Sequence, residues 1–218
     1  MTSVRDRLLG LDTCAVSDAL DALGRPGAVA GVLPVWEGSR LAGRVVTMRT
    51  VPADGRVSRS HLGTTAIERA GEGEIVVVEQ AAGPPYPSAT WGGLLAKAAA
   101  LKRLGGIVVD GACRDVDEIR ELGLPVSARE AIPFTARGRI VEDAVGVPVV
   151  IGGVTVHEGD YVLADGSGAV FVRAEDVGAV LTVAERLAAR ESLMAADLRA
   201  GRLPSEVLGK DYEEMLDE

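Results

Sequence analysis

The sequence predicts an α/β fold, and two features of its 218 residues indicate this class. Between about residues 44 and 128, short apolar runs typical of strands alternate with segments of helical spacing. After residue 130, short β-like runs separated by glycines lead into one long amphipathic helix. We find no linker and no clear repeat, so we expect a single domain over residues 1–218, with a polar tail from about residue 201.

The composition is that of a globular protein and argues against several classes of function. The chain is 47% hydrophobic but only 3% aromatic, so aliphatic side chains and alanine must fill the core. Its net charge of -9 and the lack of a basic cluster argue against a nucleic-acid surface. No apolar run could span a membrane, and the N-terminus lacks the apolar segment of a signal peptide. We therefore expect a cytoplasmic protein with two reduced thiols, Cys14 and Cys113.

The first expected element is a helix over about 15–23, which Asp12 and Thr13 can cap and Gly24 ends. A turn-rich segment over 24–43 follows. Strands are expected over 44–50, 74–79, 107–110, 125–128, 147–151, 154–156, 161–164 and 169–172. Further helices are expected over 61–70, 94–104, 115–122 and 175–199.

The stretch 91–118 combines a glycine pair, a helix, an apolar strand and a polar turn. The helix begins at Gly92 and Gly93, where free backbone N–H groups and the positive dipole end suit an anion. The strand ends shortly before Arg114 and Asp115, and ligands commonly bind at strand C-termini in α/β proteins. If both ends lie on one edge of the sheet, they form a pocket for a small carboxylic acid and a divalent metal.

Each of these residues also has an ordinary structural explanation. A pair such as Arg114 and Asp115 is most often a surface ion pair, although Arg suits forked carboxylate binding and Asp suits Mg²⁺. The glycines can simply open a helix. Asp110 and Glu118 flank the turn, and each can hold a metal-bound water or be a surface charge.

Other candidates are less specific. His61 and His157 lack metal-ligand spacing, and Asp160 and Asp165 lie in turns, where Asp is common for backbone reasons. The thiol of Cys113 stands beside an arginine that could lower its pKa, although we favour a spectator thiol.

The runs WGGLLAKAA, GGIVVDGACRDVDEI and LPVSARE resemble the RraA-like family. This family includes the 4-hydroxy-4-methyl-2-oxoglutarate / 4-carboxy-4-hydroxy-2-oxoadipate aldolases and the regulators of ribonuclease E activity. The resemblance continues in LDTCAVSDALDALG, LAGRVVTM and VPVVIGGVTVHEGDYVLADGSGAVFV, and it covers roughly residues 8 to 200. The family pattern of Gly or Asp, twenty residues, Arg-Asp, two residues and an acid is met by Gly93, Arg114, Asp115 and Glu118.

The resemblance implies a β/β/α swivelling-domain core and a homotrimer or homohexamer with sites at subunit interfaces. It implies that Asp115 binds the divalent metal, Mg²⁺ or Mn²⁺, and that Arg114 binds the pyruvyl group of a 2-oxo acid. It also implies a helix acid from the adjacent subunit, for which Glu191 is the match. The substrate carboxylate would be held by the backbone N–H groups of Gly92, Gly93, Leu94 and Leu95.

Two functions remain open on this resemblance. The first is a metal-dependent lyase, a 4-hydroxy-4-methyl-2-oxoglutarate-type aldolase giving pyruvate, with oxaloacetate decarboxylase activity. Its base would be a metal-bound water, or a water held by Glu118 or Glu191. It needs no Schiff-base lysine, and we interpret Lys97, the nearest one, as a helix-surface residue. The second is a non-catalytic regulator of a ribonuclease, because Gly93 stands where several aldolases have Asp.

Overall fold

The computed structural model describes residues 2–57 and 61–209. Its main sheet has nine strands in the order β1-β11-β10-β3-β4-β5-β6-β2, with β7 paired to β3. Strands β3 to β6 are parallel, and all other pairings in this sheet are antiparallel. The strands of this sheet are β1 (Ala28–Val29), β2 (Leu33–Pro34), β3 (Leu41–Pro52), β4 (Ile75–Gln80), β5 (Gly106–Cys113), β6 (Val126–Ala131), β7 (Ile140–Val145), β10 (Tyr161–Asp165) and β11 (Gly168–Val172).

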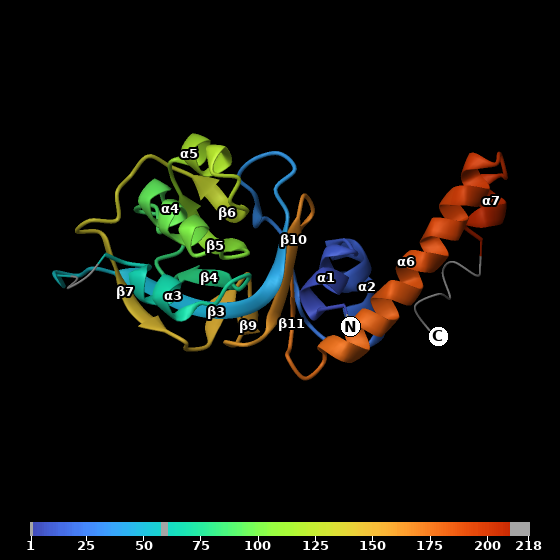
Figure 1. Ribbon diagram of the computed structural model, residues 1–218, viewed down its shortest axis with the longest axis horizontal. Helices are drawn as coiled ribbons and strands as arrows, with labels where there is room; N and C mark the ends of the chain where they lie inside the picture. The colour runs from blue at the N-terminus through green and yellow to red at the C-terminus, as the bar shows by residue number, and fades with distance from the viewer. Residues whose placement is uncertain (1, 58–60, 210–218) are drawn as a thin grey trace.

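Helices cover the two ends of the sheet from opposite sides (Figure 1). The helices α3, α4 and α5 pack on the parallel strands, whereas α1, α2 and α6 pack outside β10 and β11. The second sheet is the hairpin of β8 (Val149–Ile151) and β9 (Val154–Val156). The helices are α1 (Val4–Leu9), α2 (Thr13–Ala22), α3 (Thr64–Arg69), α4 (Gly93–Leu101), α5 (Val116–Glu121), α6 (Val177–Arg199) and α7 (Pro204–Val207).

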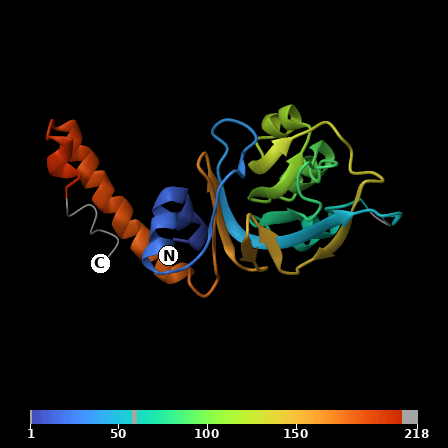
Figure 2. The same cartoon turned by 180° about the vertical axis from the view of Figure 1, so that it is seen from behind.

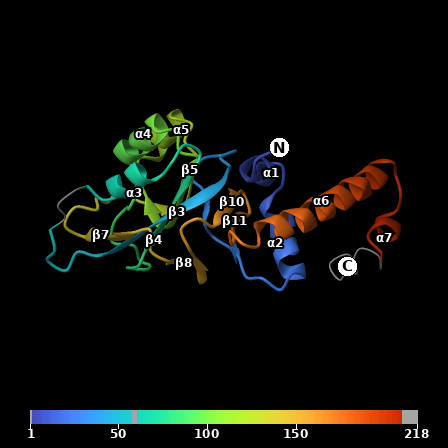
Figure 3. The same cartoon turned by 60° about the horizontal axis from the view of Figure 1, so that its bottom comes forward.

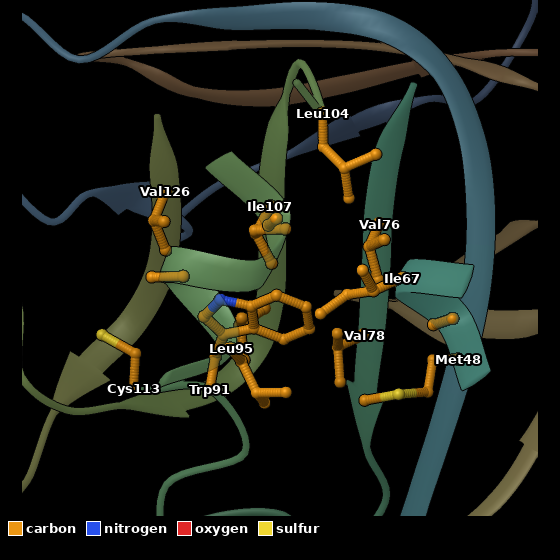
Figure 4. Close-up of a cluster of buried hydrophobic side chains, with 14 of the residues drawn as sticks. Met48, Ile67, Val76, Val78, Trp91, Leu95, Leu104, Ile107, Cys113 and Val126 are labelled. Carbon is orange, nitrogen blue, oxygen red and sulfur yellow. The ribbon is translucent and has the colours of Figure 1, made fainter. Parts of the chain in front are cut away.

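The parallel strands bury side chains on both faces, as the near-continuous Val and Ile runs of such strands require. On one face, Val76 and Val78 contact the layer of α3 to α5, with Trp91 and Leu95 in the same cluster (Figure 4). On the other face, the alternate residues of β4 pack against β8, β9, β10 and β11. The resulting order is helices, parallel strands, antiparallel strands and helices, which confirms the α/β class.

The fully buried residues of helix α6 are confined to its first half. Its buried residues end at Leu187, and the rest of the helix extends away from the sheet with α7 at its far end (Figure 2). The same projection is visible from below (Figure 3). Residues 210–218 of the expected tail lie outside the described residues. No helix in the described ranges is long and apolar enough to cross a membrane.

Several element boundaries were predicted wrongly. Strand β5 continues past residue 110 to Cys113, with a register shift between Val109 and Ala112. The side chain of Gln80 supports this irregularity, because its Oε1 accepts the Ala112 N–H at 3.0 Å. Strand β7 was not predicted, since its acids at 142 and 143 interrupt the apolar pattern. The segment 24–43 also contains β1 and β2, which we did not predict as strands.

The helix predictions need smaller corrections. Helix α1 was not predicted, α3 covers only Thr64–Arg69 of the expected 61–70, and α4 ends at Leu101 instead of residue 104. The long helix was placed within two residues of its observed start at Val177, and its end at Arg199 was correct.

Candidate active site

The start of α4 and the end of β5 lie side by side. Trp91 and Cys113 form a parallel bridge, and the Arg114 N–H donates to the Trp91 carbonyl at 2.9 Å. The next contact is made by Gly93, whose N–H donates to Asp115 Oδ2 at 2.9 Å. Our expectation that the glycine pair and the Arg-Asp pair share one edge of the sheet is thus confirmed.

Both glycines lie in close contact with side chains from the turn after β5. A Cβ at Gly92 would lie 2.9 Å from Asp115 Oδ2 and 3.1 Å from Arg114 Nε. A Cβ at Gly93 would lie 1.6 Å from Glu118 Oε2, so the Glu118 carboxylate occupies the space that a side chain at position 93 would need. The start of α4 is therefore also the surface against which the side chains of Arg114, Asp115 and Glu118 pack.

Asp115 has a backbone conformation that is uncommon outside glycine. Its φ of 58° and ψ of 40° are left-handed, a region that Asp tolerates better than most residues. The residue begins α5, and its carbonyl accepts the Ile119 N–H at 3.0 Å. This turn directs the carboxylate back to Gly93, while Oδ1 accepts no hydrogen bond from the described part of the chain.

Two ion pairs stand at this edge. Arg114 Nε lies 3.3 Å from Asp115 Oδ2, and both side chains are 39% exposed. Lys97 Nζ contacts Glu118 Oε1, and this hydrogen bond raises the pKa of Lys97. The interpretation of Lys97 as a helix-surface residue is confirmed, since its side chain is 50% exposed, and the structure adds its pairing with Glu118. A raised pKa also disfavours the neutral amine that a Schiff base would require.

These residues line a cleft of about 810 Å³. Its walls include the glycine pair, Leu94, Leu95, Arg114, Asp115 and Glu118. The sequence analysis did not place Arg56, His61 and Arg137 in this cleft, which they line together with apolar residues such as Leu62 and Ile140. No motif marked these residues, because they come from the segments before α3 and before β7 and meet only in the folded chain.

The other candidate acids have structural partners. Asp110 pairs with Arg129 at 2.6 Å and accepts the Gly152 N–H at 2.6 Å, and since its side chain is only 16% exposed, it belongs to a structural ion pair and is not the expected surface charge. Asp160 is 3% exposed and accepts the N–H groups of His157 and Ala174. Glu191 is not among the residues that line the cleft of its own chain. It lies on α6 near α2, where burial and the charges of Asp18 and Asp12 raise its pKa.

The thiol beside the Arg-Asp pair is not activated. Cys113 is fully buried at the end of β5, and burial raises the pKa of its thiol to about 12. The alternative of a lowered pKa is wrong, because desolvation of the thiolate outweighs any attraction to the neighbouring arginine.

Most of the chain is similar to known proteins. A family model described as "RraA-like: Aldolase/RraA" matches residues 13–171. A Deinococcus radiodurans protein named "Putative 4-hydroxy-4-methyl-2-oxoglutarate aldolase" is 31% identical over 165 residues, which cover 75% of this chain and 98% of that protein. The Legionella pneumophila protein DlpA is 27% identical over 189 residues, or 86% of this chain, but the chain spans only 30% of DlpA.

A solved structure confirms the expected type of fold. The structure of Streptomyces coelicolor RraAS2 is described as an unusual member of the RNase ES inhibitor RraA protein family. It superposes with a TM-score of 0.77 at 27% identity and covers 87% of this chain and 94% of its own. Since the family model matches 159 of the 218 residues, counted from 13 to 171, the chain belongs to the RraA-like family.

Proposed function

We propose that this chain is a divalent-metal-dependent lyase that cleaves a carbon–carbon bond of 2-oxo acids. The reaction would be of the 4-hydroxy-4-methyl-2-oxoglutarate aldolase type and give pyruvate, with oxaloacetate decarboxylation as a second activity. The observation that carries the proposal is the convergence of Arg114, Asp115 and Glu118 on the start of α4 in one cleft. The names of aldolase relatives support the same chemistry.

The donor groups of the cleft fit Mg²⁺ or Mn²⁺ held through few protein ligands. The described residues contain no cluster of three His, Cys, Asp or Glu side chains that could hold a metal. Mg²⁺ usually keeps several waters and binds through one or two carboxylates together with the substrate. Asp115, with one oxygen fixed by Gly93 and one open, suits that mode. A bound cation would supply Lewis acidity at the oxo oxygen, where negative charge develops during cleavage.

Arg114 and the start of α4 would bind the acid end of the substrate. The guanidinium suits forked contact with a planar carboxylate. The Gly93 N–H already donates to Asp115, so the N–H groups of Gly92, Leu94 and Leu95 remain at this helix start for an anion. We therefore narrow the proposed carboxylate site from four backbone N–H groups to these three.

Glu118 would act as the base for aldol cleavage. It would take the proton of the C4 hydroxyl while the bond between C3 and C4 breaks, which leaves a carbonyl product and the enolate of pyruvate. Protonation of that enolate at C3 gives pyruvate. Its carboxylate is well placed for this role, because it lies over Gly93 and lines the cleft. Decarboxylation of oxaloacetate breaks the corresponding bond with loss of CO₂ and has no hydroxyl proton to remove.

The decisive experiment is turnover of oxaloacetate and of 4-hydroxy-4-methyl-2-oxoglutarate. We expect activity with Mg²⁺ or Mn²⁺, loss of activity with EDTA, and recovery when excess metal is restored. Full activity after exhaustive chelation would reject the metal requirement. Absence of any turnover with metal would favour the second function, a non-catalytic regulator of a ribonuclease, to which the likeness to RraAS2 points.

We also propose a homotrimer or homohexamer in which Glu191 of one subunit serves the site of another. The exposed second half of α6 supports this, because Leu193 is 70% exposed there. Light scattering should give a trimeric or hexameric mass at micromolar concentration, and a monomeric mass would reject a shared site.

A further inference from the structure

We infer that Lys97 is a positioning residue that holds the Glu118 carboxylate over Gly93 and so sets the base for carbon–carbon cleavage. This inference rests on the proposed function for the consequence on turnover. The placement of Glu118 by Lys97 is a separate structural claim that can be tested without substrate or metal.

The first step of the argument is the place of the carboxylate. Glu118 Oε2 and Cδ lie 1.6 Å and 2.6 Å from the position of a Cβ on Gly93. The same Cβ position is 3.4 Å from the Cβ of Asp115. Two carboxylate side chains therefore pack over one glycine at the helix start, where their negative charges repel one another.

The second step is the cation that keeps this arrangement together. Arg114 contacts Asp115, and the cation that contacts Glu118 is Lys97, through Nζ and Oε1. Lys97 is four residues after Gly93, so it lies on the same side of α4, one turn further along. The Glu118 side chain is 37% exposed and has three rotatable bonds, so without this partner it can turn into solvent.

The third step is that Lys97 does not belong to the cleft itself. The cleft is lined by Gly93, Asp115 and Glu118, but Lys97 is not among its lining residues. Its influence on the reaction would therefore pass through Glu118. An ordinary helix–helix ion pair at such exposure would stabilise only the contact of α4 with α5, and only weakly.

The test compares Lys97→Met and Lys97→Arg with Glu118→Gln and the double variant Lys97→Met/Glu118→Gln. Arg120→Met is the matched control, because Arg120 pairs with Asp117 on the exposed side of α5 at 2.8 Å. Lys97→Met should lower kcat for aldol cleavage about tenfold with KM little changed, a part of the roughly 10²–10⁴-fold that a positioned base contributes. Lys97→Arg should retain most of kcat, and the double variant should be no slower than Glu118→Gln alone.

The second measurement is the amide resonance of Gly93 in the substrate-free protein, by ¹H–¹⁵N correlation spectra. Lys97→Met and Glu118→Gln should move this resonance in the same direction, whereas Lys97→Arg and Arg120→Met should leave it near the wild-type position. A Gly93 resonance that moves in Glu118→Gln but not in Lys97→Met would overturn the inference, as would additive losses of kcat in the double variant. If the wild-type protein has no turnover, the proposed function fails and the Gly93 resonance alone decides whether Lys97 positions Glu118.

Discussion

At the parallel end of the sheet, Asp115 and Glu118 lie in an open cleft, and each is matched by one partly exposed cation. At the antiparallel end, Asp160 and Asp165 accept backbone N–H groups in the turns that flank β10, and Asp160, which also pairs with Arg173, is almost fully buried. The first pair leaves oxygen atoms accessible to a ligand, whereas the second pair uses them to fix the chain. The side-chain chemistry is the same at both ends, so the accessibility of the carboxylates distinguishes a candidate site from a structural one.

The largest effect is expected from Asp115→Asn. Asparagine can still accept the Gly93 N–H, so the fold and melting temperature should change little. Loss of the negative charge should weaken metal binding and lower kcat by about 1,000-fold, since a bound cation contributes several kcal/mol to charge stabilisation. Metal-dependent turnover and Mn²⁺ affinity by calorimetry are the measurements. If Asp115→Asn has wild-type kinetics, Asp115 is not a metal ligand, and the carboxylates at the two ends of the sheet no longer differ in function.

Glu118→Gln should separate the two proposed reactions. The amide cannot accept the hydroxyl proton, so kcat for aldol cleavage should fall about 100-fold. Oxaloacetate decarboxylation requires no such proton transfer and should fall far less. Parallel assays with both substrates measure the loss of kcat for each reaction. Equal losses for the two reactions would show that Glu118 is not the base.

Arg114→Lys keeps the charge but loses the forked contact. Each charge-assisted hydrogen bond contributes roughly 1.5–3 kcal/mol, so we expect kcat/KM for 2-oxo acids to fall about 10- to 100-fold. Part of the loss should appear in kcat, because the contact strengthens as charge develops. Steady-state kinetics and melting curves test this. If Arg114→Lys and the wild type have equal kinetics, Arg114 does not bind the substrate. A large fall in melting temperature would make Arg114 a structural residue.

Asp165→Asn should show the opposite behaviour, with a loss of stability and unchanged kinetics. Burial opposes ionisation of Asp165, but hydrogen bonds from Thr13 and Ser167 outweigh it and lower the pKa. The substitution should cost about 1–3 kcal/mol of unfolding free energy at neutral pH. A group with a lowered folded pKa stabilises above its unfolded pKa, so the difference from wild type should shrink as pH falls through the folded pKa. Urea unfolding of the wild type and Asp165→Asn between neutral and acidic pH measures this difference in stability. A kinetic defect without a loss of stability would contradict the structural role of Asp165.

Asp18→Asn should give the smallest effect, with the reverse sign. Burial, followed by the charges of Asp21 and Asp12, raises the pKa of Asp18 in the packing of α2 on α6. Such a group favours the folded state below its unfolded pKa, and that contribution is lost as pH rises through the folded pKa. The neutral variant should therefore be more stable at pH 7 by no more than about 0.5 kcal/mol, a gain that disappears in acid. Stability that falls at pH 7 would show that Asp18 has a partner that depends on its charge.

The sequence alone determined the order of elements at the site. A glycine pair, a helix, an apolar strand and an Arg-Asp turn follow one another along the chain, and parallel strands bring such ends to one edge of a sheet. The glycine-bounded runs after residue 130 likewise predicted β9 at its observed bounds. These features could be predicted because turn residues and hydrophobic periodicity are local properties of the chain.

Only the tertiary structure decided which groups meet. The reach of Lys97 to Glu118 depends on how α4 and α5 pack on the sheet, and the extension of β5 depends on the Gln80 side chain from the neighbouring strand. The cations Arg56 and Arg137 share a cleft with Arg114 although they come from distant segments. Contacts of this kind were not predictable from spacing, because side chains separated by many residues meet through the packing of whole elements, which local patterns do not record.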